Sequence, residues 1–363
     1  MSKSKIGTLE AIFIVLSALV PFTVTSLPII IMHETKSSCL LNIIYVTVIC
    51  TAIAFLIYLL FKKFPGFDII DISNYLGGNI FKNIIGFIFI FYFIISSSLL
   101  LRNFCEGLNV VYFPYTNIAF IILMFIISIG FTNYLGFNSS IRTTAIIFPI
   151  TLISIVLLFF GNIDNFTFER IFPILGDGFE KTFILGITNV GTFAGISYLY
   201  FLPPLLKNPK KFKTLSILST VFSGLFIFTC ISTLLFMFSM FNETNELMPL
   251  FVVSRYIEFG EFFQRFESLF LLIWTISFCF YLSITCKFST TIFTKMFNLK
   301  DPSQLIIPFV TLIFAIAILP KNYSISSFFE NHVYRNITIA IILIGLLILF
   351  LSNLKKKAGS KNV

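Results

Sequence analysis

The sequence predicts an all-α polytopic membrane protein with about ten transmembrane helices, arranged as two inverted five-helix repeats. Composition is the first of three observations behind this prediction. Of the 363 residues, 57% are hydrophobic and only 11% are charged, and the mean hydropathy is +0.99. These values lie far outside the usage of soluble proteins. The chain is therefore expected to form a single transmembrane domain along most of its length.

The number and length of the apolar runs are the second observation. A helix needs roughly 18 to 20 apolar residues to cross a hydrocarbon core of about 30 Å. The runs place spans near 9–32, 39–61, 82–108, 115–132, 141–160, 181–205, 213–240, 266–286, 303–320 and 333–353. Repeat one then covers about 9–160, repeat two covers about 181–353, and 354–363 forms a basic tail. Alternating glycine, proline, aspartate and apolar residues over 64–80 indicate a short interfacial helix.

The distribution of charge is the third observation. With the N-terminus inside, 17 of the 25 Lys and Arg residues lie in cytoplasmic segments, whereas 12 of the 16 acids lie outside. The positive-inside rule therefore favours a cytoplasmic location for both termini, and an even number of spans agrees with this. The net charge of +9 comes from basic residues spread between the spans. It does not indicate a nucleic-acid surface.

Interruptions recur at matching places in the two halves. Ten spans divide into five and five, which gives the halves opposite orientations, as in inverted-repeat transporters. A pair of interrupted spans at corresponding positions is the best indication from sequence of a midplane binding site. The interrupting residues in spans one and six are Ser17, Pro21, Pro28, Gly186, Gly191, Gly195 and Pro203.

In span one, Pro21 lies among the hydroxyl residues Ser17, Thr23 and Thr25. Proline removes a backbone donor and frees a carbonyl one turn earlier, and half-helix ends present partial charges to a polar ligand. The same residues are also typical of a simple kink that neighbouring hydroxyls stabilise. Both interpretations remain open for this span.

Span six contains a polar and glycine-rich stretch from Asn189 to Tyr198. An unwound turn there would expose amides able to hold a carboxylate. The alternative is close helix packing, because Gly191 and Gly195 form a G-x-x-x-G motif. The matching interruption in span one favours a binding site. Tyr92 and Ser96 in span three and Thr275 in span eight carry polar groups that could face the same cavity.

Motifs for metal binding and catalysis are not found in this sequence. The six cysteines show no C-x-x-C spacing, and the two histidines, His33 and His332, lie far apart in predicted loops. We find no Walker motif, nucleophile elbow or H-E-x-x-H motif. We therefore expect no metal, no cofactor and no enzymatic activity.

Several segments carry a resemblance to a known family. The segments are Pro173–Gly178, Phe193–Gly195 and Leu202–Lys207, with a second group at 248–255 and 262–274. Together they resemble the B subunits of GerA-type spore germinant receptors, which belong to the amino acid, polyamine and organocation transporter superfamily. The likeness covers most of the chain, and the segment Pro173–Gly178 is its most specific part.

The resemblance implies a LeuT-like, permease-like domain in which helices 1 and 6 are discontinuous around a small-molecule pocket. It also implies a subunit in the spore inner membrane that senses a nutrient, often an amino acid, together with A-type and C-type partner subunits. Carried onto this sequence, the ligand-binding positions are Ser17, Pro21, Phe22, Tyr92, Ser96, Thr192, Phe193, Ala194, Gly195 and Thr275. The motif positions with a structural role are Pro173, Gly176, Gly178, Gly191 and Pro203.

One departure from the family pattern concerns the residues after Gly195. The family often has an aromatic residue and a glutamate there, whereas this chain has Ile196 and Ser197, which argues against proton coupling at that point. An amino acid secondary transporter that works by alternating access is the alternative function, and a scaffold that only anchors partner subunits is a third. The sequence leaves open which nutrient binds and whether any solute crosses the membrane.

Overall fold

The structure is a computed structural model that describes residues 5–25, 27–238, 247–257 and 266–359. Within these ranges the regular elements are helices, and one isolated β-bridge joins Ile6 to Leu206. Six helical stretches are long and apolar enough to cross a membrane, and three shorter stretches are also apolar. With the interrupted segment from 180 to 205 they form the ten predicted spans, so the all-helical prediction is confirmed.

The helices follow the predicted spans closely. The long helices are α4 (Cys39–Phe61), α5 (Ile69–Tyr112), α6 (Ile118–Tyr134), α7 (Phe137–Gly161), α9 (Phe212–Met237), α11 (Phe266–Phe297), α12 (Ile306–Ile318) and α14 (Arg335–Gly359). The short ones are α1 (Thr8–Ser17), α2 (Val20–Val24), α3 (Leu27–Thr35), α8 (Ile196–Leu199), α10 (Pro249–Ser254) and α13 (Tyr323–Phe328). The predicted boundary of span eight was too short, because α11 continues to Phe297. Residues 258–265, which include part of the second family segment, lie outside the described residues.

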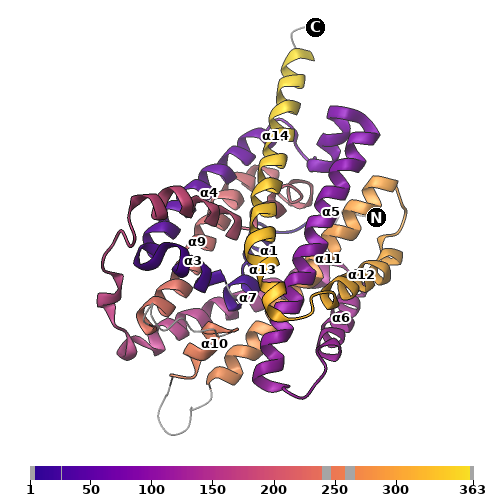
Figure 1. Cartoon of the computed structure of the whole chain (residues 1–363). Helices are drawn as coiled ribbons and strands as arrows, with labels where there is room; N and C mark the ends of the chain where they lie inside the picture. The colour runs from indigo at the N-terminus through magenta and orange to yellow at the C-terminus, as the bar shows by residue number, and fades with distance from the viewer. Residues whose placement is uncertain (1–4, 26, 239–246, 258–265, 360–363) are drawn as a thin grey trace.

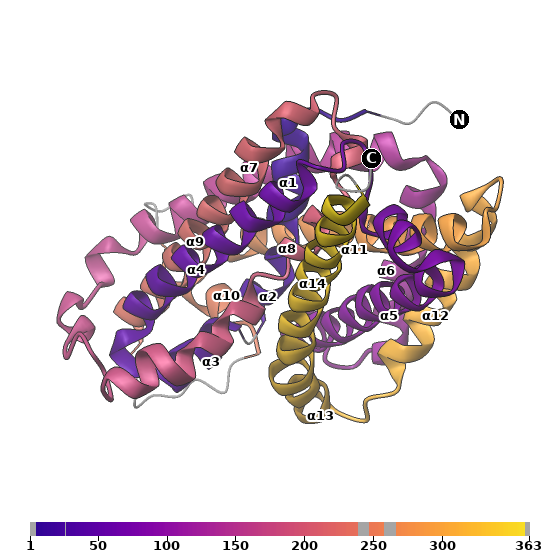
Figure 2. The same ribbon diagram turned by 90° about the horizontal axis from the view of Figure 1, so that it is seen from above.

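Corresponding helices of the two halves pack against each other. Span two (α4) packs along span seven (α9), span three (α5) along span eight (α11), and span four (α6) along span nine (α12). In Figures 1 and 2, α4 and α9 lie on one side of α14, while α5, α6 and α12 lie on the other. This pairing is what two interlocked inverted repeats produce, and it places spans one, six and ten at the junction of the two groups.

Span one is interrupted twice. The helix α1 ends at Ser17, and α2 begins after a tight turn at Ala18 and Leu19. The second interruption follows Val24, where Thr25 has φ −83° and ψ −135°, outside the helical region. Pro21 lies inside α2, at its first turn, which proline tolerates. The main break therefore comes four residues after the proline.

Span six is irregular over most of its length. It starts as a π-helix at Glu180–Ile184, continues as a 3-10 helix over Leu185–Thr192, and becomes α-helical again only in α8. Phe193, with ψ 50°, leaves the helical region at the junction. The predicted interruption between Gly191 and Gly195 is confirmed.

The predicted interfacial helix forms the first part of α5. Gly77 and Gly78 break the helical geometry, and Gly78 has φ +71°, which glycine adopts without steric cost. Asp68 caps the helix by accepting hydrogen bonds from the N–H groups of Ile70 and Asp71. Lys295 of α11 forms ion pairs with Asp68 and Asp71, which ties this segment to the end of span eight.

The segment Pro173–Gly178 docks onto the turn between α3 and α4. The Ser37 hydroxyl donates to the carbonyl of Pro173 at 2.6 Å, and the Ser38 and Thr182 hydroxyls lie 2.8 Å apart. Gly176 has φ +53°, and a Cβ there would lie 2.6 Å from the Thr35 carbonyl oxygen. The segment therefore fixes the start of span six to the end of span one.

We expect Gly176→Ala to destabilise the protein by about 1–3 kcal/mol, because alanine would combine a left-handed backbone with a steric clash. The thermal unfolding midpoint of the purified protein measures this effect. Gly130→Ala in α6 is the matched control, because open space surrounds that position. An equal loss in both variants would contradict the assigned role of Gly176.

Candidate functional site

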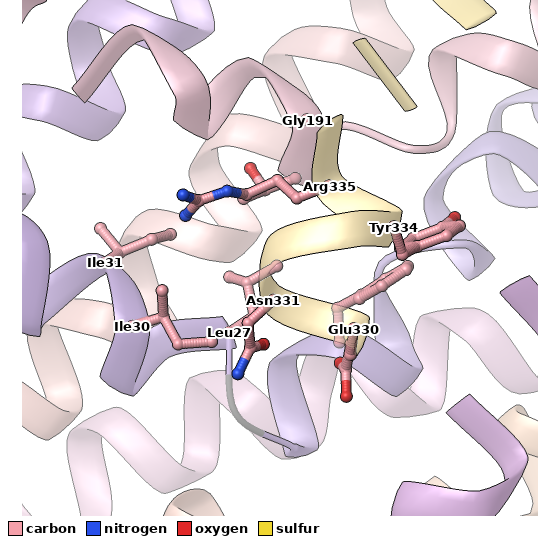
Figure 3. Close-up of a pocket in the computed structure, with 10 residues that line it drawn as sticks. Leu27, Ile30, Ile31, Gly191, Glu330, Asn331, Tyr334 and Arg335 are labelled. Carbon is pink, nitrogen blue, oxygen red and sulfur yellow. The ribbon is translucent and has the colours of Figure 1, made fainter. Parts of the chain in front are cut away.

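A small cavity lies where spans one, six and ten meet. Figure 3 shows residues of the last span facing residues of α3 across it. The space open to the centre of a water molecule is about 20 Å³, which holds about one water. Its walls are formed by Phe22, Leu27, Ile30, Ile31, Gly191, Thr192, Glu330, Asn331, Tyr334 and Arg335. In this conformation the cavity is too small for an amino acid.

A buried carboxylate, Glu330, lies in one wall of the cavity. Its side chain is buried at the π-helical turn Phe329–Tyr334, before α14. It accepts a hydrogen bond from the Thr25 hydroxyl at 3.0 Å and another from the amide of Asn103 in α5. Thr25 is the residue at the main break of span one. Glu330 therefore connects that break to spans three and ten.

A polar network extends from Arg335, which lines the cavity, to α3 and span six. Arg335 donates to both carboxylate oxygens of Glu34, at 2.6 and 2.9 Å, in a bidentate pair. It also donates to Asn189 Oδ1 at 3.2 Å, and Asn189 in turn donates to Asn42 at 2.9 Å. Asn42 holds the irregular part of span six by donating to the carbonyls of Thr182 and Gly186. The network thus spans four transmembrane segments.

An aromatic stack forms the inner wall. Tyr334 stacks on Phe22 with a centroid distance of 5.3 Å and on Tyr92 at 5.5 Å. The Tyr334 hydroxyl lies 3.0 Å from the Tyr92 hydroxyl and accepts from Ser96 at 2.9 Å. Ser96 also lies 2.7 Å from the Tyr281 hydroxyl of α11. Tyr334 therefore couples the cavity to spans three and eight.

Two glycines of span six make the closest backbone approaches around the site. A Cβ on Gly191 would lie 2.4 Å from the Arg335 carbonyl oxygen, and a Cβ on Gly195 would lie 2.4 Å from the Val15 carbonyl oxygen. The close-packing interpretation of the G-x-x-x-G motif thus describes both positions, and Gly191 also lines the cavity. Packing and cavity formation are combined in this segment.

The predicted ligand-binding residues separate into groups in the structure. Phe22 and Thr192 line the cavity, and Tyr92 and Ser96 reach it through Tyr334. The other residues of spans one and six, which are buried without lining the cavity, are Ser17, Pro21, Phe193, Ala194 and Gly195.

Thr275 lies elsewhere. It lines a second pocket of about 640 Å³, an apolar groove between α5, α6 and α11. The face of α11 that reaches the aromatic stack carries Tyr281 instead. Of the motif positions, Pro203 starts a short 3-10 turn at the end of span six.

Sequence reasoning missed the contribution of the last span. Glu330, Asn331, Tyr334 and Arg335 all line the cavity, yet the predicted span ten begins at residue 333. The sequence carried a signal for this contribution, because two charged residues lie next to an apolar run: Glu330 directly before it and Arg335 within it. Thr25, one of the hydroxyl residues of span one for which a site and a kink both remained open, is the contact between span one and this carboxylate.

The cavity combines charged groups with apolar walls. A carboxylate and a guanidinium flank it, and the buried Nε of Arg335 has no hydrogen-bond partner among the described residues. In the described part of the chain, no three His, Cys, Asp or Glu side chains gather closely enough to hold a metal ion. The fold and the cavity together define a multi-pass membrane protein built like a secondary transporter.

Comparison with known proteins gives the family. A family model described as "Spore germination protein" matches residues 5–326. The chain belongs to this spore germination protein family.

Individual relatives agree with this assignment. Spore germination protein YndE of Bacillus subtilis (strain 168) is 24% identical over 325 residues, covering 88% of each chain. Spore germination protein B2 of the same organism is 22% identical over 361 residues, covering 99% of this chain and 98% of the relative.

A solved structure supports the fold. A Na⁺-coupled sialic acid symporter in a substrate-bound outward-open state matches with a TM-score of 0.62, 13% identity, and coverage of 96% of this chain and 78% of the symporter. The predicted LeuT-like architecture with interrupted helices 1 and 6 is confirmed. At this identity the likeness concerns the fold alone.

Proposed function

We propose that this protein is the nutrient-sensing transmembrane subunit of a spore germinant receptor, and that the nutrient is an amino acid bound in the cavity between spans one, six and ten. The observation that carries the proposal is the placement of Glu330 against the break of span one. A ligand with a positive group there would replace contacts that now hold span one to span ten. Binding and conformational change would then be linked through the same residues.

The chemistry of the cavity supports a small zwitterionic ligand. Glu330 offers an acceptor for an ammonium group, and the Arg335 Nε offers a donor for a carboxylate. Leu27, Ile30 and Ile31 supply an apolar wall for a side chain. Because the cavity is too small for an amino acid in this conformation, binding requires it to widen, and we infer that separation of the Glu34–Arg335 pair widens it.

The signalling role and the location belong to the same proposal. We infer that A-type and C-type subunits read the conformational change and that the complex lies in the spore inner membrane. The face that carries Ile6 and the end of α14 would then be cytoplasmic, in agreement with its excess of lysines.

Amino acid transport by alternating access is the second candidate function. The support for it is the fold shared with a sodium-coupled symporter. It predicts uptake of labelled amino acids into proteoliposomes that contain the protein alone, whereas a receptor requires no flux. Uptake that Gly195→Leu abolishes would favour transport.

We expect Thr192→Leu to weaken the germination response to nutrients by at least about tenfold, because a leucine side chain fills the small cavity. The dose response of spores to a panel of amino acids measures this. Thr275→Leu is the matched control, since it makes the same substitution in a different pocket.

The two threonine variants separate the hypotheses. A normal dose response of Thr192→Leu spores, at normal protein level, would contradict the assigned cavity and favour the scaffold alternative. A loss in the Thr275→Leu spores alone would move the site to the groove between α5, α6 and α11.

A further inference from the structure

A further pocket lies on the face of the protein that carries Ile6 and the end of α14, here called the terminal face. The N–H of Ile6 donates to the Leu205 carbonyl, and Lys356 near the end of α14 donates to the Lys63 carbonyl. The space in this pocket that is open to the centre of a water molecule is about 270 Å³. It lies between the end of α4, the end of span six and the start of α9.

Two lysines line this pocket from opposite sides. Lys62 follows α4, and Lys210 precedes α9. The other lining residues are aromatic, proline and glycine, so no acid lines the pocket. Two lysines that line one concave site with no carboxylate among its lining residues are complementary to an anion.

The walls of the pocket are held in place by packing. Phe61 and Phe212 meet edge to face with a centroid distance of 5.7 Å, which joins α4 to α9 beneath it. Lys356 lies over the ring of Phe64 at 4.8 Å and so fixes the loop after α4. The pocket is thus a built feature and does not depend on mobile lysine side chains alone.

The surface next to the pocket points to a lipid. Lys213 lies over the ring of Phe55 on α4. A lysine takes such a position when its apolar stem covers an apolar surface and its ammonium group reaches toward lipid headgroups. Exposed apolar side chains continue from there along both helices, with Leu59 one turn from Phe55 on α4. On α9 they include Leu218 and Phe222. An acyl chain could lie along this surface while its headgroup occupies the pocket.

We propose that the pocket binds the phosphate of an anionic phospholipid, with Lys62 and Lys210 as the ligating groups. The shared chemistry is a phosphate group, and the adjoining apolar surface assigns it to a lipid in preference to a free phosphate. The proposal is independent of the nutrient cavity, which lies at the junction of spans one, six and ten.

The test compares lipid retention by the full-length protein. The protein is purified from nanodiscs of phosphatidylcholine with a minor fraction of phosphatidylglycerol, and native mass spectrometry counts the bound lipids. We expect preferential retention of phosphatidylglycerol, and about tenfold weaker retention in the Lys62→Gln, Lys210→Gln double variant. The control is Lys5→Gln with Lys300→Gln, which removes the same charge from exposed positions on the same face.

Three outcomes would overturn the proposal. Equal retention of the two lipids shows that the pocket does not select an anion. Equal losses in the double variant and the control show a general effect of surface charge. Displacement of the lipid by inorganic phosphate at similar concentration assigns the pocket to a free phosphate.

Discussion

Replacing Glu330 with glutamine is expected to raise the nutrient concentration for half-maximal germination by about 10- to 100-fold. Hydrogen bonds to a charged group contribute about 1.5–3 kcal/mol, and each 1.4 kcal/mol is a factor of ten. Glutamine keeps the size of the side chain but removes the charge that attracts an ammonium group. The dose response of spores that carry the variant with its partner subunits gives the measurement.

Glu169→Gln is the control for this experiment, because Glu169 is exposed in the segment between spans five and six. It should leave the dose response unchanged. Thermal unfolding of both purified variants separates a binding defect from a folding defect. A Glu330→Gln protein that responds to nutrients like the wild type would rule out the carboxylate as the ligand contact.

Separating the Glu34–Arg335 pair is expected to open the cavity. In Glu34→Gln or Arg335→Gln, a cysteine introduced at Ile30 should react with a water-soluble thiol reagent about tenfold faster. A tenfold change corresponds to a shift of ~1.4 kcal/mol in the equilibrium between the narrow and the open cavity. The reversed pair, Glu34→Arg with Arg335→Glu, should restore slow labelling in part, because the charges again attract across the same position.

The Asp177–Lys181 ion pair is the control for the variants of the Glu34–Arg335 pair. It is also an ion pair, at the start of span six, but both side chains are exposed, so its loss should not change labelling at position 30. If the single variants of Glu34 and Arg335 label no faster than the wild type, the pair does not close the cavity.

Much of the fold could be predicted from the sequence because a bilayer imposes simple constraints. Apolar length gives the spans, and glycine and proline mark the interruptions in spans one and six. The positions of the breaks were harder to predict. Pro21 indicated an interruption of span one, but it lies in the first turn of α2, and the backbone leaves the helical region at Thr25.

Only part of the candidate cavity's lining could be predicted, because hydropathy does not show which face of a helix meets a cavity. Thr275 and Tyr281 lie on one helix, α11, but only Tyr281 reaches the aromatic stack. Glu330 was not predicted, because it lies in the π-helical turn before α14, outside the apolar run that defines the predicted span ten. The matched interruptions correctly indicated a cavity beside Thr192, but its charged residues come from span ten.

The stacked rings of Phe22, Tyr334 and Tyr92 join spans one, ten and three, so that these spans cannot move independently. Tyr334 is the middle ring, so a rotation of span one that displaces Phe22 leaves one face of Tyr334 uncovered unless span ten follows. Packed cores respond to such strain by switching between discrete arrangements and do not deform gradually. The stack therefore links a movement at the broken helix of span one directly to span ten and, through Tyr92, to span three.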